Sequence, residues 1–310
     1  MKPWLIWVCI VCSLPLLVLG FLFIMGGFAF TRLGSLFGNR WHYSGGMGYG
    51  RMAPMPNQSA IIYSASQSGT SHIYTVAWNG TVSQQLTHDP GGDSDAAVSP
   101  NGTQIAFVRQ SADSTHLWLM NANGTGQHQI TFGPDSQTQP CFAPSGKQIA
   151  YVNSLQYGIW HIWIANLNGT GARQLTNAIL NDADTCPVFD KTGTTIFYSH
   201  YSGTIGRLQI YAVKTAGGVP VLLGYGTRAT VSPNGTQIAY YDAPQNQTMG
   251  IMNINGSSRR ILKTNFGYGS YLDFCSNGAL LAYKAFPRTG KVNLVTINAN
   301  TGATRTVATL

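Results

Sequence analysis

The ten residues SPNGTQIAFV, at positions 99–108, decide the fold because the chain repeats them. Close copies are APSGKQIAYV at 143–152, DKTGTTIFYS at 190–199, SPNGTQIAYY at 232–241 and CSNGALLAYK at 275–284, and a degenerate copy, MPNQSAIIYS, lies at 55–64. The aromatic residues that follow the small apolar pair of the copies are Tyr63, Phe107, Tyr151, Tyr198, Tyr240 and Tyr283. A repeat of about 40 residues that is made of short strands indicates a blade of a β-propeller.

Four strand signals recur in each repeat. In the second repeat they cover residues 96–99, 104–109, 116–121 and 127–131, where apolar and polar residues alternate and β-branched or aromatic side chains are common. One blade cannot bury its apolar face alone, so successive blades must stack around an axis. The sequence therefore predicts an all-β fold, a six-bladed β-propeller of four-stranded antiparallel blades over residues 52–310. Because each blade comes from one contiguous stretch, we expect the ring to close by packing alone.

Short turns of the Asn-Gly kind separate the strands. Asn101-Gly102 joins the first and second strands of the second repeat, and Asn123-Gly124 joins its third and fourth. Asn-Gly favours the type I′ hairpin, in which both central residues have positive φ. All of these turns fall on one face of the predicted propeller, and the longer connections fall on the opposite face. Binding sites concentrate on long loops, so we expect any ligand face there.

The pattern LT…SP.G…IAF…IY…NGTG resembles the repeat of TolB-type propellers, which also occurs in the propeller domains of prolyl oligopeptidase-like enzymes. The resemblance covers residues 52–310. It implies the fold but neither family's activity, because the sequence has no G-x-S-x-G nucleophile elbow and no stretch that could form the α/β domain of either family. The family's usual Asp in the SPDG turn is replaced, and the residues at that position are Asn57, Asn101, Ser145, Thr192, Asn234 and Asn277.

The first part of the chain has a different character. Residues 3–31 contain no charged side chain and are bracketed by Lys2 and Arg32. A membrane-spanning helix needs about 20 apolar residues, whereas the apolar core of a secretory signal has about 7–15. We therefore expect residues 1–32 to form one N-terminal transmembrane helix, with a cleaved signal sequence as the alternative. Residues 33–51 are rich in Gly and Met and are predicted to be a linker. The resemblance and the signal-like start favour a propeller on the periplasmic or extracellular side of the membrane.

Charge is sparse and unevenly distributed. The chain has no Glu, and charged residues make up 9% of it. Residues 52–190 have a net charge of −5, whereas residues 191–310 have a net charge of +9. Such an asymmetry arises by chance on a solvated surface or serves oriented docking on a partner, since electric fields steer association. Nucleic acid is not an expected partner, because the basic residues are not clustered with aromatic residues along a groove.

The cysteines and histidines do not predict a metal or cofactor site. Cys141, Cys186 and Cys275 lie in or beside inner strands and are expected to be free thiols, with a Cys141–Cys186 bridge as the alternative. Histidines recur at one position of the third strand, where we expect packing or exposure rather than metal binding: His72, His116 and His161. Acidic residues gather in the loops that enter the inner strands of repeats two to four, and we expect them to be solvated: Asp89, Asp93, Asp95, Asp135, Asp182 and Asp184. They do not form the D-x-D-x-D-G series of a calcium loop.

One set of matched positions is the candidate site. Four residues before the Ser-Pro position, the repeats carry Arg51, Asp95, Gln139, Cys186, Arg228 and Tyr271. These residues differ from one another, as a binding site on a repetitive scaffold would require, and they should line the mouth of the central channel. In the fourth repeat the nearest charged residue is Asp184. We therefore predict a ligand- or partner-binding site formed by Arg51, Asp95, Gln139, Asp184, Arg228 and Tyr271.

Two classes of function follow from these patterns. The first is a membrane-anchored interaction scaffold or accessory subunit, whose partners are other membrane or extracytoplasmic proteins. The second is a propeller that binds a small ligand or carbohydrate, such as a lyase that uses the channel mouth. General acid–base catalysis needs positioned groups with tuned pKa values, and the sequence shows no set of residues of this kind. We therefore favour the non-enzymatic class.

Overall fold

The computed structural model describes residues 52–67, 69–80, 82–155, 159–179, 182–242, 248–263, 272–286 and 291–309. These residues form strands and turns and contain no helix. Accordingly, none of them belongs to a helix that could cross a membrane. The predicted anchor (1–32) and linker (33–51) lie outside the described residues. The described part of the chain is all-β, as predicted.

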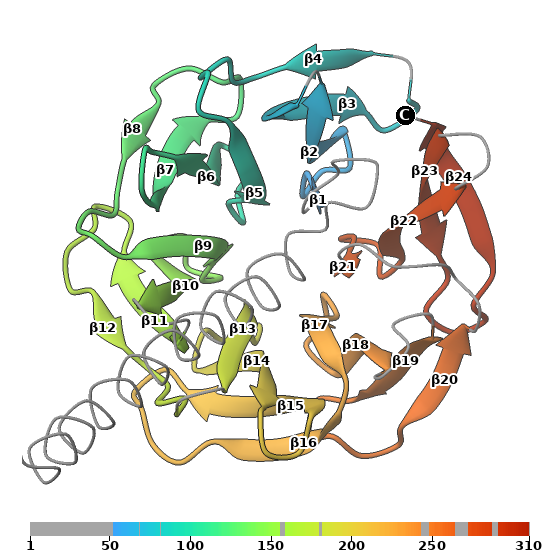
Figure 1. The fold of residues 1–310 in the computed structure, drawn as a ribbon. Coiled ribbons are helices and arrows are strands. Elements are labelled where there is room, and N and C mark those ends of the chain that lie inside the picture. The colour runs from blue at the N-terminus through green and yellow to red at the C-terminus, as the bar shows by residue number, and fades with distance from the viewer. Residues whose placement is uncertain are drawn as a thin grey trace, which may run out of the picture. The chain divides into compact units, whose positions relative to one another are not determined.

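The strands follow the six repeats in order (Figure 1). The first two repeats contain β1 (Met52–Pro54), β2 (Ala60–Gln67), β3 (Thr70–Ala77), β4 (Ser83–Gln85), β5 (Asp93–Val98), β6 (Gln104–Gln110), β7 (Thr115–Asn121) and β8 (His128–Gln129). The next two contain β9 (Ser136–Phe142), β10 (Gln148–Leu155), β11 (Ile159–Asn166), β12 (Arg173–Gln174), β13 (Ala183–Phe189), β14 (Thr195–Ser202), β15 (Arg207–Lys214) and β16 (Val221–Tyr225). The last two contain β17 (Thr227–Val231), β18 (Gln237–Asp242), β19 (Thr248–Asn253), β20 (Arg260–Lys263), β21 (Leu272–Phe274), β22 (Leu280–Phe286), β23 (Lys291–Ile297) and β24 (Thr304–Thr309).

Within each repeat the four strands pair in chain order, and every pairing is antiparallel. Repeats one, two, five and six each form a separate four-stranded sheet. Repeats three and four are joined, because Trp160 of β11 pairs with Ala183 of β13 in a single parallel contact. The resulting eight-stranded sheet was not predicted, since the repeat pattern gave each blade its own sheet. The first strand of each repeat lies toward the centre of the ring and the fourth lies at the rim (Figure 1).

Apolar residues between neighbouring repeats form the core. One cluster joins repeats two and three, with Leu117 and Leu119 packed in the same cluster as Phe142 and Tyr151. Another cluster contains residues of the first, fifth and sixth repeats together, including Tyr63, Tyr241 and Leu294. Among the described strands, β24 pairs only with β23 and β1 pairs only with β2. Among the described residues the last repeat therefore meets the first without exchange of a terminal strand, through side-chain packing and also through hydrogen bonds of Gln58 with Ser276 and Asn277, so closure does not rest on packing alone.

The Asn-Gly turns differ from the prediction. At the turn after β5, the backbone N–H of Gly102 donates to the carbonyl of Ser99 at 2.8 Å, and only the glycine has positive φ, at 73°. Asn123-Gly124 has the same form, with Gly124 alone at positive φ. Both are therefore type I turns followed by a left-handed glycine, not type I′ turns. The predicted role of the asparagine was wrong.

The asparagine in these turns acts as a hydrogen-bond acceptor. Asn101 Oδ1 accepts from Ser99 Oγ, from the backbone N–H of Thr103 and from Thr103 Oγ1, at 2.8, 3.1 and 2.9 Å. Asn234 makes the same three contacts in the fifth repeat. One amide oxygen therefore holds both ends of the turn, which explains why a short acceptor side chain occupies this position.

Candidate functional site

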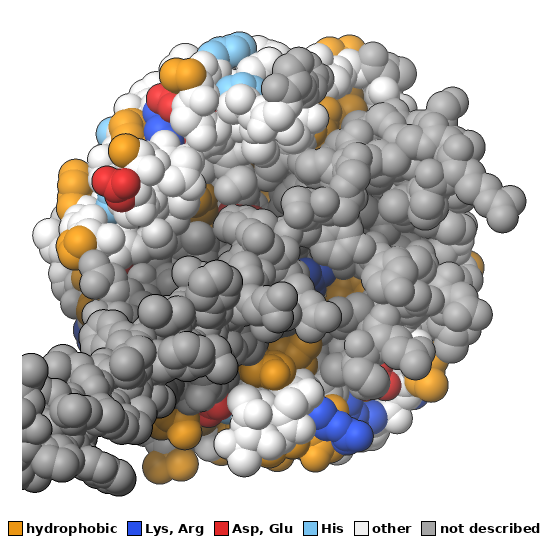
Figure 2. All heavy atoms as spheres, in the orientation of Figure 1, with side chains coloured by type: hydrophobic (Ala, Val, Ile, Leu, Met, Phe, Trp, Pro, Cys, Tyr) orange, Lys and Arg blue, Asp and Glu red, His pale blue; other side chains and the backbone are white. Residues whose placement is uncertain are grey.

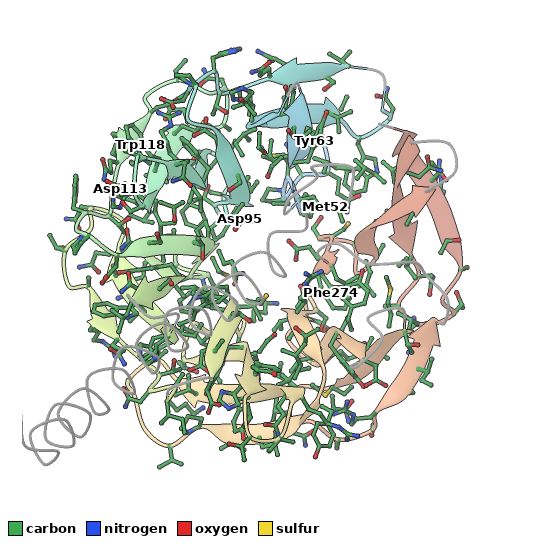
Figure 3. All side chains as sticks on the ribbon, viewed as in Figure 1. Met52, Tyr63, Asp95, Asp113, Trp118 and Phe274 are labelled. Carbon is green, nitrogen blue, oxygen red and sulfur yellow. The ribbon has the colours of Figure 1, made fainter. Side chains whose placement is uncertain are left out.

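Four of the predicted channel-mouth residues share an unusual backbone conformation. Asp95, Gln139, Cys186 and Arg228 have φ of 49°, 54°, 53° and 53°. Each lies on an inner strand where the pairing register shifts, which marks a β-bulge. Figure 3 shows Asp95 on β5 toward the centre of the ring. The positions matched by sequence are therefore equivalent in the structure, and all four side chains are half-buried.

The left-handed conformation at these positions is strained. It disfavours residues other than Gly, Asn and Asp by roughly 1–2 kcal/mol each. The neighbouring repeats help to hold two of the bulges by hydrogen bonds. The N–H of Cys186 donates to Gln139 Oε1 at 2.6 Å, and the N–H of Arg228 donates to Ser199 Oγ at 2.9 Å. Gln139 therefore links the bulges of repeats three and four, so its side chain has a structural role in the ring.

The remaining predicted site residues are not part of this set. Arg51 and Tyr271 lie outside the described residues, so the structure does not place them. Asp184 lies two residues before the bulge, on β13, and is only 2% exposed. Its Oδ1 atom is 2.8 Å from Nδ1 of His200 on β14. The charged residue chosen for the fourth repeat is thus buried within the repeat, and Cys186 occupies the matched position.

A polar layer that sequence reasoning missed lies two residues before the bulges of repeats two, three and four. We call it the seam layer, and it consists of the cross-strand pairs Asp93–Arg109, Gln137–Asn153 and Asp184–His200. Each pair occupies the same register in successive repeats, and each is hydrogen-bonded. Buried polar groups need such partners. The side chains of the layer form an ion pair, an amide pair and an acid–imidazole pair in turn, while the backbone register stays the same.

Asp93 and Arg109 form the ion pair of the seam layer. Arg109 Nε and Nη2 lie 2.7 and 3.2 Å from the two oxygens of Asp93, whose side chain is completely buried. Arg109 also donates to Gln127 Oε1 at 2.8 Å and lies over the ring of Trp118, 4.4 Å from its centroid. The prediction that Asp93 is solvated was wrong, because the guanidinium group of Arg109 on the adjacent strand pairs with its buried carboxylate.

The third-strand histidines extend the seam layer from one repeat to the next. His116 Nδ1 donates to Gln137 Oε1 at 2.8 Å, which joins the second repeat to the third. Gln137 Nε2 in turn donates to Asn153 Oδ1 at 2.8 Å. His116 is 7% exposed and His161 is 5% exposed, so both are buried at their repeat position, in agreement with the prediction. The described residues contain no cluster of three or more His, Cys or Asp side chains suited to a metal ion.

The densest titratable group surrounds Asp184. The hydrogen bond that His200 donates to Asp184 raises the pKa of His200 above its usual value, although burial acts in the opposite direction and the charges of Asp184 and Asp182 add to the increase. Burial lowers the pKa of His161, an effect that the nearby Asp184 charge partly offsets. Burial also raises the pKa of Tyr198, and Asp184 reinforces that change. Asp182 accepts the N–H of Gly203 at 2.8 Å. The hydrogen bonds and charges of these groups are therefore compensated by other residues of the fourth repeat or by residues of the third repeat that contact it.

The three described cysteines, Cys141, Cys186 and Cys275, form no disulfide bond, as expected. The alternative, a Cys141–Cys186 bridge, is not formed. Burial raises the pKa of Cys275 to about 12, and the charge of Asp273 contributes. Because the thiolate is the reactive form, the Cys275 side chain is an unreactive apolar residue at neutral pH.

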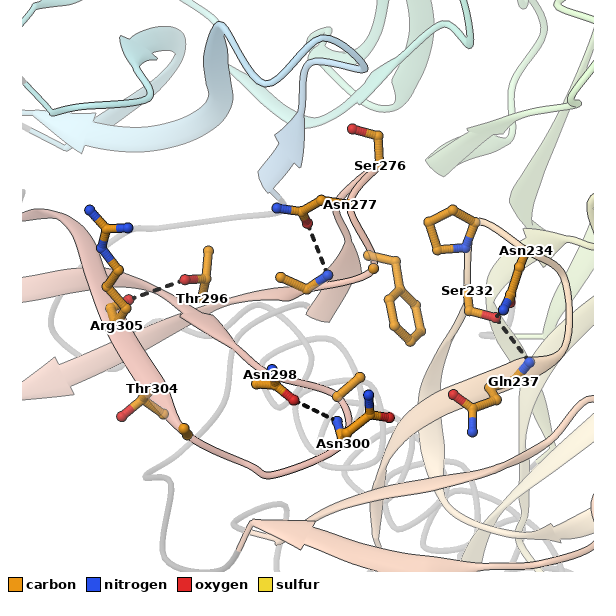
Figure 4. A pocket seen from close by; sticks show the side chains of 16 residues that line it. Ser232, Asn234, Gln237, Ser276, Asn277, Thr296, Asn298, Asn300, Thr304 and Arg305 are labelled. Atoms are coloured by element: carbon orange, nitrogen blue, oxygen red, sulfur yellow. Dashed lines mark hydrogen bonds between the residues drawn. The ribbon is translucent and has the colours of Figure 1, made fainter.

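A polar hollow of about 680 Å³ lies between the fifth and sixth repeats (Figure 4). Its walls include the turns around Asn234, Asn277 and Asn298, so it lies on the face of the short turns rather than on the predicted ligand face. The amide oxygens of Asn277 and Asn298 accept backbone N–H groups of their own turns at 3.0 and 2.9 Å. These side chains are already engaged in turn structure, and Arg305 is the only ionisable residue in the lining. The hollow is therefore a weak candidate for a specific site.

The TolB beta propeller domain model matches residues 43–183 and 140–310, and the chain belongs to this family. A putative TolB from Agrobacterium tumefaciens has 17% identity and a TM-score of 0.63, over 77% of this chain and 90% of that one. TolB from Acinetobacter baumannii has 17% identity and a TM-score of 0.65, over 87% of this chain and 68% of that one. An oligogalacturonate lyase from Vibrio parahaemolyticus has 10% identity and a TM-score of 0.50, over 75% of this chain and 85% of that one. No match was found among curated proteins.

Proposed function

We propose that this protein is a membrane-anchored, extracytoplasmic six-bladed β-propeller that serves as a docking scaffold for other proteins. Membership of the TolB propeller family supports a role of this class, because the propeller of this family is a fold without a fixed activity. Residues 1–32 supply the anchor in this proposal, and residues 33–51 supply the tether.

The observation that carries the proposal is that the buried ionisable side chains pair with one another inside the fold. The buried acids Asp93 and Asp184 are paired inside the seam layer, where they join strands. An enzyme instead directs its tuned groups into a cavity that the substrate can reach. Most basic residues described in the later repeats are exposed, among them Arg207, Lys214 and Arg259, whereas Arg228 is half-buried. Charge is therefore available on the outside of the ring, where a partner would meet it.

The experiment is in vivo cross-linking of the full chain, followed by purification from solubilised membranes. We expect the chain in the membrane fraction after an alkaline wash, together with a stoichiometric protein partner. A variant that lacks residues 3–31 should be lost from the membrane fraction. A chain found free of both membrane and partner proteins would contradict the proposal.

Ligand binding at the channel mouth is the second candidate. It is favoured by the four unlike side chains at Asp95, Gln139, Cys186 and Arg228, which share one backbone conformation and are half-buried. The test is thermal unfolding of the purified chain in the presence of acidic oligosaccharides. A rise in melting temperature that Arg228→Ala abolishes would support this candidate, and the absence of any shift would count against it.

A further inference from the structure

The rim of the fourth and fifth repeats carries an apolar and basic surface. Five of the nine large apolar side chains that are exposed in the described residues lie there: Val219, Val221, Leu222, Tyr225 and Ile261. Val219 is 91% exposed and Val221 is 60% exposed. We call this surface the basic rim, and its exposed basic members are Arg207, Lys214, Arg259 and Arg260. Figure 2 shows hydrophobic and basic side chains side by side on this part of the molecule.

Contacts between the two repeats organise the basic rim. Arg259 donates to the carbonyl of Tyr225 and lies over the ring of Tyr240, 4.8 Å from its centroid. Arg207 lies over the ring of Tyr225 at 5.3 Å. Both guanidinium groups are therefore fixed at the Tyr225 end of β16, and Val221 and Leu222 lie toward the other end of the strand.

The outer edge of β16 has no strand partner among the described residues, because β16 ends its sheet and pairs only with β15. It has five residues, whereas the fourth strands of the other repeats, β4, β8, β12, β20 and β24, have three, two, two, four and six. Short or charged outer strands protect a sheet against pairing with other chains. The strand β16 is one of the two longest outer strands and is mainly apolar, and apart from the carbonyl of Tyr225, to which Arg259 donates, its edge offers backbone hydrogen-bonding groups to an extended segment.

The charges near this edge select the partner. Residues 191–310 contain eleven basic residues and only two acidic ones, Asp242 and Asp273. Both of these acids are half-buried, on an inner and a second strand. The basic rim therefore presents positive charge without a nearby exposed acid. Charge complementarity of this kind determines specificity and association rate.

We propose that the outer edge of β16 binds an acidic, extended segment of a partner protein, which adds to the sheet as a fifth strand. This inference deepens the docking function proposed above and rests on it. Adjacent residues of a strand point to opposite faces of the sheet, so the apolar side chains of the segment would lie beside Val221, and its carboxylates would lie on the opposite face beside Arg207. The backbone hydrogen bonds supply affinity and the side chains supply specificity.

The test uses the full chain in neutral detergent and a short fluorescent peptide that alternates aspartate with valine. We expect the peptide to bind, and binding to weaken at least tenfold in Val221→Asp and to weaken with added salt. The matched control is Val82→Asp, because Val82 is 65% exposed beside the outer strand of the first repeat. This control should bind the peptide like the unmodified chain. Equal binding by Val221→Asp and the unmodified chain would overturn the inference.

Three further measurements separate the alternatives. A peptide methylated on alternate backbone nitrogens should not bind, and its binding would exclude strand addition. Full chain in phosphatidylcholine nanodiscs should not bind vesicles of equal parts phosphatidylcholine and phosphatidylglycerol through this surface. Binding that Val221→Asp abolishes would assign the rim to a membrane instead. Self-association that the same variant abolishes would assign it to a second copy of the chain. Both results would overturn the inference.

The cross-linking experiment distinguishes this inference from the docking function. If the unmodified chain and Val221→Asp capture the same stoichiometric partner, the docking function stands and the β16 assignment fails. If neither captures a partner although the peptide binds at the rim, the docking function fails.

Discussion

At the scale of single residues, Arg109 makes the largest set of contacts in the seam layer. It pairs with the buried Asp93, donates to Gln127 and covers the ring of Trp118. Removal of one partner leaves an uncompensated buried charge, which destabilises a protein by about 3–5 kcal/mol. We therefore expect Arg109→Ala to reduce the free energy of unfolding by about this amount, as measured by urea denaturation.

Two controls accompany this variant. Asp113→Ala removes an exposed carboxylate and should change the free energy of unfolding by less than about 0.5 kcal/mol. Arg109→Lys keeps the charge but cannot form the two-pronged contact, so it should not restore full stability. A loss below about 1 kcal/mol in Arg109→Ala would show that the pair contributes little, as exposed ion pairs do.

The bulge residue Cys186 tests the strain of the channel-mouth positions. Its φ of 53° is disfavoured for β-branched side chains and readily adopted by glycine. Cys186→Val should therefore lower the free energy of unfolding by about 1–2 kcal/mol more than Cys186→Gly does. Urea denaturation of both variants provides the comparison. Equal stability of the two would mean that the backbone at this position can relax.

His161 and His200 predict how stability depends on pH. The pKa of His200 is raised in the folded state, so its contribution is complete below the unfolded value of 6.5 and is lost as the pH rises through the folded value. The pKa of His161 is lowered, so its contribution is present above 6.5 and is lost as the pH falls through the folded value. We therefore expect a maximum of stability near pH 6.5.

The measurement is the melting temperature across the pH range, for the unmodified chain and for His200→Gln. The variant removes the titrating imidazole that Asp184 holds, so its stability should no longer fall above pH 6.5. The slope with pH is the readout, because a merely structural loss would lower every point equally. A variant with the same alkaline slope as the unmodified chain would exclude His200 as the cause.

At the scale of elements, the turns between third and fourth strands pack closely against the preceding repeat. A Cβ at Gly169 would lie 2.3 Å from the carbonyl oxygen of Ile130 in the preceding repeat. Gly206 has a similar positive φ, but a Cβ there would meet nothing within 4 Å. Both alanine variants share the backbone strain, and only Gly169→Ala adds overpacking, which costs about 1–3 kcal/mol. We expect that difference between the two variants in urea denaturation, and its absence would mean that the repeats can separate slightly.

The strands were predictable because each repeat alternates in the same way. The second and third strands of repeat two match the prediction within one residue, at β6 and β7. The fourth strand is shorter than predicted, because β8 keeps only two paired residues before the chain leaves the rim. The turn type was missed, because Asn-Gly suits two geometries and its amide contacts depend on Ser99 and Thr103.

The candidate site was predictable in part. The bulge residues align by sequence because they stand at a fixed distance from the Ser-Pro turn. The burial of Asp93 and Asp184 was not predictable from loop composition, since it depends on which residue lies opposite on the next strand. Arg109 and His200 stand at that opposing position, sixteen residues later in both repeats. A search for complementary residues at this spacing would have found both pairs.

At the scale of the whole molecule, each repeat is built from one contiguous stretch, and apolar packing joins the last repeat to the first. A circular permutant that begins before β5, with residue 310 linked to residue 46, therefore keeps every described strand pairing. We expect it to unfold cooperatively with a melting temperature within a few degrees of the unmodified chain, as measured by circular dichroism. A permutant without a cooperative transition would show that the native order of the chain is needed.

The uneven charge of residues 52–190 and 191–310 must also be corrected for burial. Part of the negative charge of residues 52–190 does not reach the surface, because Asp93, Asp182 and Asp184 are buried. Most basic residues described in the later repeats stay exposed, including Lys191, Lys214 and Arg305, with the half-buried Arg228 as an exception. The surface of the ring is therefore more one-sidedly positive than the residue counts indicate, which favours partners that carry carboxylates.

The turns that use an asparagine as hydrogen-bond acceptor should keep their hydrogen bonds when the pH falls. A carboxylate in the same place would take up a proton at low pH and lose acceptor capacity, whereas the amide oxygens of Asn101 and Asn234 keep theirs. The fourth repeat differs, because Asp190 holds its turn. Burial alone would raise the pKa of Asp190, but hydrogen bonds from Thr192, Thr195 and Thr194 hold it below the usual value. On acidification, this turn should loosen while its asparagine-built counterparts remain closed.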